Sequence, residues 1–172
     1  MRRYPYVGDE SVREFVEGCP EGEVIDDLRI LRCWLEAADD DREPGGNVTF
    51  VVDLLGRLRL APRRSEHVAC AGGGEVLAAG EIAFEVGAHG RVDVVTLTNQ
   101  STGYCPDESC FAAVAQALDR LAGDGELHRP ESFTEAFVFR RCEACGERNL
   151  VKEGWFVCDL CGADLPDAWN FV

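Results

Sequence analysis

The sequence predicts an α+β protein: helices at the N-terminus, a β-rich core closed by one helix, and a small metal-stabilised module at the C-terminal end. Three observations predict this class. Apolar residues recur at helical spacing near the start of the chain, short β-type runs separated by glycines fill the middle, and two CxxC pairs lie near the end. With 172 residues, of which 46% are hydrophobic, the chain can form one core and such an appendage.

Residues 1–46 are acidic and predict a helical N-terminal segment. Asp9 or Ser11 can cap a short first helix that ends near Gly18. A second helix is predicted from an amphipathic stripe, which consists of Val24, Ile25, Leu28, Leu31, Trp34 and Leu35. The acidic run at 39–41 then predicts a solvated turn, because carboxylates are unfavourable at the C-terminal end of a helix dipole.

Residues 47–122 predict the β-rich core. Its β-type runs are residues 48–54, 58–60, 76–78, 82–86 and 92–97. Gly56 is placed for a hairpin turn between the first two runs, and the glycines between the later ones favour a compact antiparallel meander or small barrel. After Pro106, the apolar spacing of residues 107–121 predicts one closing helix.

Residues 123–136 are expected to form a linker, and residues 137–172 a zinc ribbon. Its predicted ligands are Cys142, Cys145, Cys158 and Cys161, two CxxC pairs separated by twelve residues. Each pair can fold as a tight turn with both sulfurs pointing inward, and two such turns supply the tetrahedral thiolate set that Zn²⁺ prefers. Four thiolates leave no open coordination position, so we expect one structural zinc ion per chain.

A module of this size cannot bury enough apolar surface alone, so metal binding must supply part of its folding free energy. Its expected small core is aromatic, with one or two of the rings available as exposed anchors for a partner: Trp155, Phe156, Trp169 and Phe171. The charges around the cysteines are nearly balanced. A protein partner is therefore favoured over DNA or RNA.

The composition also bounds the function. A net charge of −15 disfavours nucleic-acid binding, because a polyphosphate would be repelled. No apolar run is long enough for a membrane span, and no apolar region follows the two N-terminal arginines, so we expect a cytoplasmic protein that does not bind membranes. The nine cysteines are odd in number, and the five outside the two CxxC pairs show no disulfide-framework spacing, which fits reduced thiols. Lys152 is the single lysine, which suggests the arginine-rich coding bias of a bacterium.

The stretch from Thr98 to Pro106 gathers hydroxyl, amide, phenol and thiol groups between a predicted strand and a predicted helix. Such connections often carry binding residues. A hydrogen-bonded turn, with Gly103 at positive φ and Pro106 leading into the helix, explains the same residues without a ligand. Cys105 with His67 as its base is a further alternative, a thiol nucleophile.

Residues 47–121 also resemble a known domain through three short motifs. These are Arg64-Ser65-Glu66-His67 before Ala71-Gly72, then Val76-Leu77-Ala78-Ala79-Gly80-Glu81, and finally Asn99-Gln100-Ser101-Thr102-Gly103-Tyr104-Cys105-Pro106. They are similar to the uncharacterised Ser-Gly-His-Tyr-x-Pro domain of bacterial toxin-like proteins and of calmodulin-binding proteins with an IQ motif. The chain lacks the histidine before Tyr104 and has no IQ segment.

If the shared positions form a site, its candidate catalytic residues are His67, Glu81, Ser101 and Tyr104. Histidine and tyrosine could hold a nucleotide, and Glu81 could face an oxocarbenium-like centre, as in ADP-ribosyl transfer. The first functional hypothesis is a cytosolic zinc-binding adaptor, in a bacterial toxin- or defence-linked system. The alternative is a small nucleotide-dependent enzyme that uses the region from His67 to Tyr104. Oligomeric state is left open.

Overall fold

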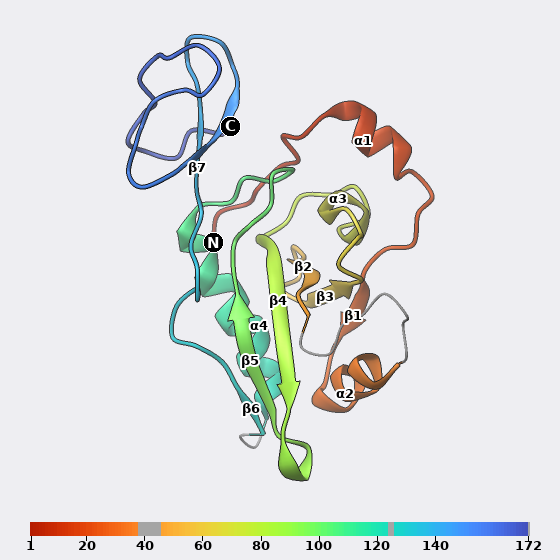
Figure 1. Cartoon of the computed structure of the whole chain (residues 1–172). Helices are drawn as coiled ribbons and strands as arrows, with labels where there is room; N and C mark the ends of the chain where they lie inside the picture. Colours follow the sequence, from red (N-terminus) through yellow and green to blue (C-terminus); the bar gives the residue numbers. More distant parts are fainter. Residues whose placement is uncertain (38–45, 124–125, 172) are drawn as a thin grey trace.

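The computed structural model describes residues 1–37, 46–123 and 126–171 (Figure 1). The predicted acidic turn at 39–41 lies outside these residues. The described helices are α1 (Glu10–Phe15), α2 (Leu28–Glu36), α3 (His67–Cys70) and α4 (Phe111–Ala122), with short 3-10 turns at Ala88–Gly90 and Glu108–Cys110. The described strands of the main sheet are β1 (Glu23–Ile25), β2 (Val48–Val52), β3 (Leu58–Ala61), β4 (Ala78–Val86), β5 (Val92–Leu97) and β6 (Leu127–His128). The chain is thus α+β, as the sequence predicts.

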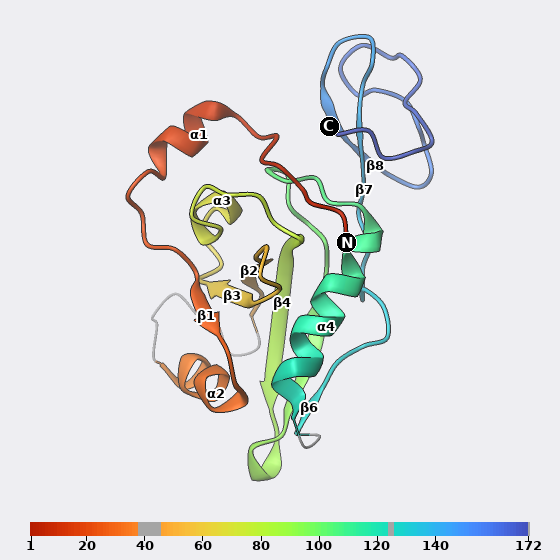
Figure 2. The same cartoon turned by 180° about the vertical axis from the view of Figure 1, so that it is seen from behind.

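The main sheet is curled and mixed, with the strand order β1-β3-β2-β4-β5-β6. All neighbouring pairs are antiparallel except β5 and β6, which are parallel. Every residue of β2 is buried, which suits its central position. Figures 1 and 2 show α4 along one face of the sheet, where its apolar stripe is buried, namely Ala113, Val114, Ala117, Leu118 and Leu121.

The N-terminal segment differs from its prediction in one respect. Val24 and Ile25 belong to the edge strand β1, paired with β3, and not to a helix. The helix begins later because the Asp27 side chain accepts a hydrogen bond from the backbone N–H of Ile30 and so caps α2. The first helix agrees with its prediction: Asp9 caps α1 by accepting from the backbone N–H of Ser11.

The core contains one long strand where the sequence predicts two. Gly80 lies inside β4, opposite Phe50 of β2. A Cβ atom at Gly80 would come within 2.0 Å of the Thr98 carbonyl oxygen, so glycine is needed for close backbone approach and not for a turn. The segment expected to be a linker supplies β6, whose Leu127 pairs with Val92. Among the described residues, no helix combines the length and apolar character needed to cross a membrane.

The C-terminal module contains the two-stranded sheet of β7 (Val138–Arg141) and β8 (Arg148–Val151). The strands are antiparallel, and Arg141 pairs with Arg148 at the closed end of the hairpin. In the rest of the module, isolated antiparallel β-bridges join Lys152 to Trp155 and Val157 to Asp164. Figures 1 and 2 show this module at the end of the molecule away from the turn between β4 and β5.

Candidate metal centre and the loop beneath it

The four predicted ligands meet in space. The sulfur atoms of Cys142 and Cys161 are 3.5 Å apart, and those of Cys145 and Cys158 are 3.6 Å apart. All four lie within 4.8 Å of one another. A tetrahedral ion with metal–sulfur bonds of about 2.3 Å requires sulfur–sulfur separations of about 3.8 Å. The donor set therefore fits one metal ion, and the distances are far too long for disulfide bonds.

The two CxxC turns have the same backbone hydrogen-bond pattern. In the first, Cys142 donates its N–H to the Glu147 carbonyl at 2.8 Å, and Gly146 donates to the Cys142 carbonyl at 2.8 Å. In the second, Cys158 donates to Ala163 at 2.8 Å and Gly162 to Cys158 at 2.9 Å. These bonds orient both cysteines of each turn toward the same point.

The glycine in each turn is required by the backbone conformation. Gly146 has φ 79° and Gly162 has φ 74°, values in the left-handed region that side chains disfavour. No described atom lies within 4 Å of the position that a Cβ would occupy at either glycine. The constraint is therefore on the backbone angle and not on the space around it.

A buried asparagine joins the two turns. The Asn149 side chain is 3% exposed; its amide nitrogen donates to the Glu147 carbonyl at 3.0 Å. Its amide oxygen accepts from the backbone N–H of Asp159, next to Cys158, at 2.9 Å. One side chain thus fixes the position of the second turn relative to the first. Sequence reasoning missed this residue, because its only local signal is an amide side chain in a short strand.

The backbone of the second turn also favours a thiolate. The N–H groups of Cys161 and Leu160 lower the pKa of Cys158 to about 6, and hydrogen bonds from the neighbouring thiols act in the same direction. The N–H of Glu147 acts to lower the pKa of Cys145, but the contacts with the neighbouring thiols help to raise it overall.

The four sulfurs would fill the coordination sphere of a tetrahedral ion, which leaves no position for a substrate or a water molecule. Zinc and iron both accept such sets. The chemistry available to the centre is consequently structural: an ion there links two backbone turns that a core this small cannot hold together. That core is Cys142, Cys158 and Leu165, with Val151, Phe156 and Ala163 packed against it.

The aromatic residues of the module have different environments. Phe171 is completely buried, and Phe156 lies under the guanidinium of Arg140, 5.6 Å from the ring centroid. Trp155 is 70% exposed, in the turn that follows β8. Leu160, between the cysteines of the second turn, is 69% exposed. Trp155 and Leu160 are therefore apolar groups that the module presents to solvent.

The loop at residues 98–106, which the sequence analysis marks as a candidate binding site, holds the C-terminal module in place. Asn99 is fully buried, and its side chain exchanges two hydrogen bonds with the backbone of Phe137, at 2.7 and 2.8 Å. Its amide nitrogen also donates to the Pro106 carbonyl at 2.9 Å. This asparagine closes the loop and attaches the chain that enters β7.

Two further contacts come from the module itself. Arg148 donates to the Thr102 carbonyl at 2.7 Å, and the Trp169 indole N–H donates to the Cys105 carbonyl at 2.7 Å. The Trp169 ring also lies edge-on against Tyr4, 5.4 Å away, so the tail of the chain reaches the N-terminus. The Asn99 side chain and the carbonyl groups of Thr102 and Cys105 are thus committed to contacts within the protein.

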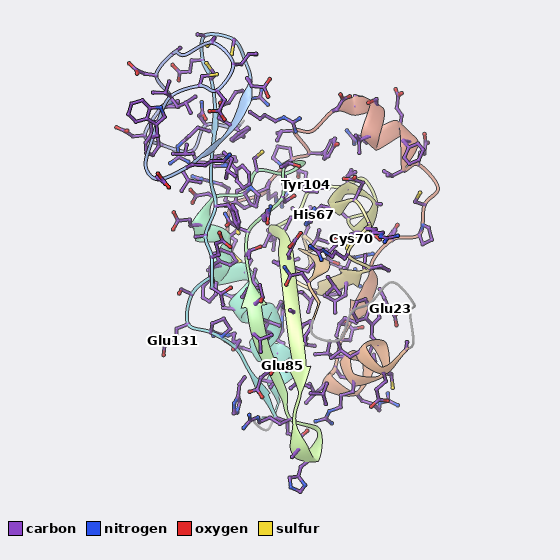
Figure 3. All side chains as sticks on the ribbon, viewed as in Figure 1. Glu23, His67, Cys70, Glu85, Tyr104 and Glu131 are labelled. Carbon is purple, nitrogen blue, oxygen red and sulfur yellow. The ribbon has the colours of Figure 1, made fainter. Side chains whose placement is uncertain are left out.

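The four candidate catalytic residues lie near the start of β4 and the end of β5, but their functional groups have other partners. His67 begins α3; its Nε2 lies 2.9 Å from the Gly80 carbonyl oxygen (Figure 3). Glu81 accepts a hydrogen bond from Asn47 at 2.9 Å. Burial lowers the pKa of His67 and outweighs the Gly80 carbonyl and nearby carboxylates, which raise it. The imidazole is therefore held neutral and donates to Gly80.

The other two candidates are removed from solvent. Tyr104 has no exposed surface and donates its hydroxyl to the Gly74 carbonyl at 2.6 Å; burial raises its pKa. Ser101 is 1% exposed, and its hydroxyl has no hydrogen-bond partner among the described residues. Within the described part of the chain, no hydrogen bond joins any two of the four. Whether they act catalytically stays a prediction.

Cys105, the alternative thiol nucleophile, is also buried. Its sulfur donates to the Thr102 carbonyl at 3.3 Å, and burial raises the pKa of the thiol to about 12. A thiol with that pKa stays protonated and weakly nucleophilic at neutral pH. Cys105 has a positive φ of 45° and lies in the loop that holds the module.

No protein-family model, curated protein or solved structure matches the chain. The resemblance of residues 47–121 to the Ser-Gly-His-Tyr-x-Pro domain therefore stays a hypothesis.

Proposed function

We propose that the protein is a zinc-binding adaptor in which a single structural Zn²⁺ stabilises the C-terminal module and that module binds another protein. The convergence of Cys142, Cys145, Cys158 and Cys161 within 4.8 Å is the observation that carries the proposal. A closed thiolate set supplies folding free energy and no catalysis. What remains for the module to do is recognition.

The exposed apolar residues support recognition of a protein. Trp155 and Leu160 are more than two-thirds exposed in a module whose other large apolar residues are buried or half-buried. Exposed aromatic and aliphatic anchors are typical of protein interfaces. The net charge of −15 makes a nucleic acid a poor partner for the same surface.

Metal analysis is the first test. Freshly purified protein is expected to contain one zinc per chain and no iron absorption bands, and Cys145→Ser should lose the metal. The matched control is Cys33→Ser, which removes an exposed thiol in α2 and should retain a full equivalent. Purified wild-type protein that contains no metal, or contains iron, would contradict the zinc assignment.

Partner capture tests recognition. A double variant, Trp155→Ser with Leu160→Ser, should lose a defined partner that the wild-type protein retains. Leu55→Ser, at a 71%-exposed position in the turn between β2 and β3, should bind it normally. Equal binding by all three proteins would show that these two residues do not form the interface.

We also propose a cytoplasmic location, which is supported by nine free cysteines in the structure. A toxin- or defence-linked role in a bacterium is an expectation from the sequence. The enzymatic alternative, nucleotide chemistry at His67 and Glu81, has less support because Ser101 and Tyr104 are buried. It predicts that Glu81→Gln abolishes hydrolysis of a nucleotide such as NAD without changing the zinc content.

A further inference from the structure

A large apolar groove lies beside α1. Its volume is about 850 Å³, within the range of ligand-binding pockets. The apolar residues that line it are Val12, Phe15, Val16, Trp34, Leu60, Ala61 and Ala69. We call this cavity the α1 groove. Its walls come from α1, α2, the end of β3 and α3, and it contains none of the zinc ligands or candidate catalytic residues.

The α1 groove is bounded by a helix that contributes little to the core. No residue of α1 is buried, and Phe15 at its end is 83% exposed although its ring lines the groove. The base is formed by well-buried residues, including Leu60, which is 1% exposed, and Ala61, which is 5% exposed. An aromatic ring left at the edge of a firm apolar base is the arrangement of an interface anchor.

The rim of the groove is acidic. Glu21, Glu23 and Glu66 line it, beside a single arginine, Arg64. A second cavity of about 430 Å³ shares Val16, Cys19, Glu21 and Ala69 with it and adds three further carboxylates, Glu10, Glu14 and Glu17, with one arginine, Arg13. The two cavities together present six carboxylates and two arginines. An apolar base with such a rim complements an apolar face flanked by lysine or arginine.

We propose that the α1 groove binds a basic, amphipathic segment of another protein. The apolar side chains of that segment would pack on Leu60, Ala61 and Phe15, and its cationic side chains would meet the glutamates of the rim. This mode of recognition places an amphipathic helix in a hydrophobic groove. It uses a surface formed by residues 10–23, Trp34 and residues 60–73, none of which belongs to the zinc module, and so adds a second binding surface to the protein.

The test uses a synthetic, fluorescently labelled peptide of about 18 residues, built of leucine and lysine with the leucines at helical spacing. Binding to the metal-loaded full chain is followed by fluorescence anisotropy near 0.15 M ionic strength. The leucine–lysine peptide is expected to bind about tenfold or more tightly than two controls. One control replaces each lysine with glutamate, and the other replaces each leucine with serine and keeps the charge.

Two pairs of variants separate the groove from general attraction to an acidic protein. Glu23→Lys with Glu66→Lys reverses two rim charges, whereas Glu85→Lys with Glu131→Lys makes the same change in net charge at exposed positions elsewhere, as Figure 3 shows for Glu23, Glu85 and Glu131. The rim pair should weaken binding about tenfold and the control pair less than about threefold.

A further pair of variants tests the apolar contribution to peptide binding. Phe15→Ser should weaken binding about fivefold or more, whereas Leu55→Ser, at a similarly exposed position outside the groove, should have no effect.

Equal losses in the two charge-reversal pairs would show non-specific attraction and overturn the proposal. Equal affinity for the serine–lysine peptide, or unchanged binding by Phe15→Ser, would overturn it as well. Because Cys145→Ser leaves the groove residues in place, loss of zinc and loss of peptide binding are separable results.

Discussion

The indole N–H of Trp169 donates a hydrogen bond of 2.7 Å to the backbone carbonyl of Cys105. The bond links the last residues of the metal-binding module to the loop that connects β5 with α4. The ring lies against Tyr4 and Phe171, and the guanidinium of Arg2 lies 4.6 Å from its centroid. Trp169 is thus the residue through which the tail, the core loop and the N-terminus meet.

Replacement of Trp169 should uncouple the module from the core. Trp169→Phe keeps a ring but loses the hydrogen bond, and should lower the free energy of unfolding by about 1 kcal/mol. Trp169→Ala also leaves a cavity, and should lower it by about 3 kcal/mol. Urea unfolding followed by circular dichroism measures both values. Hydrogen exchange in the loop at residues 98–106 should become faster in Trp169→Ala.

The control for Trp169 is the other tryptophan of the module. Trp155 is 70% exposed, so Trp155→Ala should change the free energy of unfolding by no more than about 0.5 kcal/mol. Equal effects of the two alanine variants would show that the contacts of Trp169 contribute nothing beyond those of a surface ring. A large loss of unfolding free energy in Trp155→Ala alone would show that Trp155, and not Trp169, belongs to the core of the module.

The sequence was sufficient for features that depend on local pattern. The spacing of the cysteines predicts that their four sulfurs converge, as they do, and the strand at Val92–Leu97 is predicted residue for residue. The cap at Asp9 is recognised because a short polar side chain before an apolar turn is itself the signal. Asp27 carries the same signal for α2, and it would have separated Val24 and Ile25 from the helix.

Other features depend on contacts between distant residues, which local pattern does not record. Gly80 has the sequence appearance of a break, yet it continues β4 because the Thr98 carbonyl occupies the place of a side chain. Asn99 and Asn149 hold backbone groups 38 and 10 residues away. The four-residue helix α3 is too short to show a period. Such side chains become recognisable only when the fold brings their partners to them.

The neutral state of His67 gives a pH-dependent prediction. Burial lowers its pKa below the value near 6.5 that it has in the unfolded chain. As the pH falls below about 6.5, the unfolded chain binds a proton that the folded chain resists, so stability is fully present above that pH and decreases below it. His67→Gln should remove this component, measured as the slope of the unfolding free energy between about pH 7 and pH 5.

His89→Asn is the matched control for His67, since His89 lies in an exposed turn with φ 61°, which asparagine tolerates. In this variant the slope of the unfolding free energy against pH should equal that of the wild-type protein, including any part of the slope that comes from protonation of the cysteines. Identical slopes in wild-type protein and His67→Gln would mean that the imidazole takes up its proton as readily in the folded chain as in the unfolded one.

Asp53 stabilises the turn between β2 and β3. One carboxylate oxygen accepts from the backbone N–H groups of Leu55 and Arg57, both at 2.9 Å, and the other accepts from the Arg57 guanidinium at 2.8 Å. Burial acts to raise the pKa of this carboxyl group, but the N–H and guanidinium of Arg57 outweigh it and the pKa is lowered. The stabilisation is present above the unfolded pKa, near 3.9, and is lost as the pH falls through the folded value.

Asp53→Asn should therefore lower the free energy of unfolding by roughly 1–2 kcal/mol at neutral pH, and the difference from wild type should shrink below about pH 4. Thermal unfolding at a series of pH values measures it. Asp26→Asn, an exposed position before α2, should change stability by less than about 0.5 kcal/mol at any of these values. A difference for Asp53→Asn that grows as the pH falls would reverse the predicted sign.

Asn149 should control how tightly the metal is held, although it is not a ligand. Asn149→Ala removes the hydrogen bonds to Glu147 and Asp159 that fix the two CxxC turns relative to each other, so the sulfurs must be ordered by the ion alone. The zinc affinity, measured by competition with a chromogenic chelator, should fall about tenfold. Asn170→Ala removes a similar pair of bonds, to the backbone of Arg141 just before the first cysteine turn, but leaves the link between the two turns in place. It should lower the affinity much less than Asn149→Ala, because Asn149 still holds the two cysteine turns together. An equal loss in both variants would mean that zinc binding reports the folding of the whole module, and that Asn149 has no special part in placing the second pair of sulfurs.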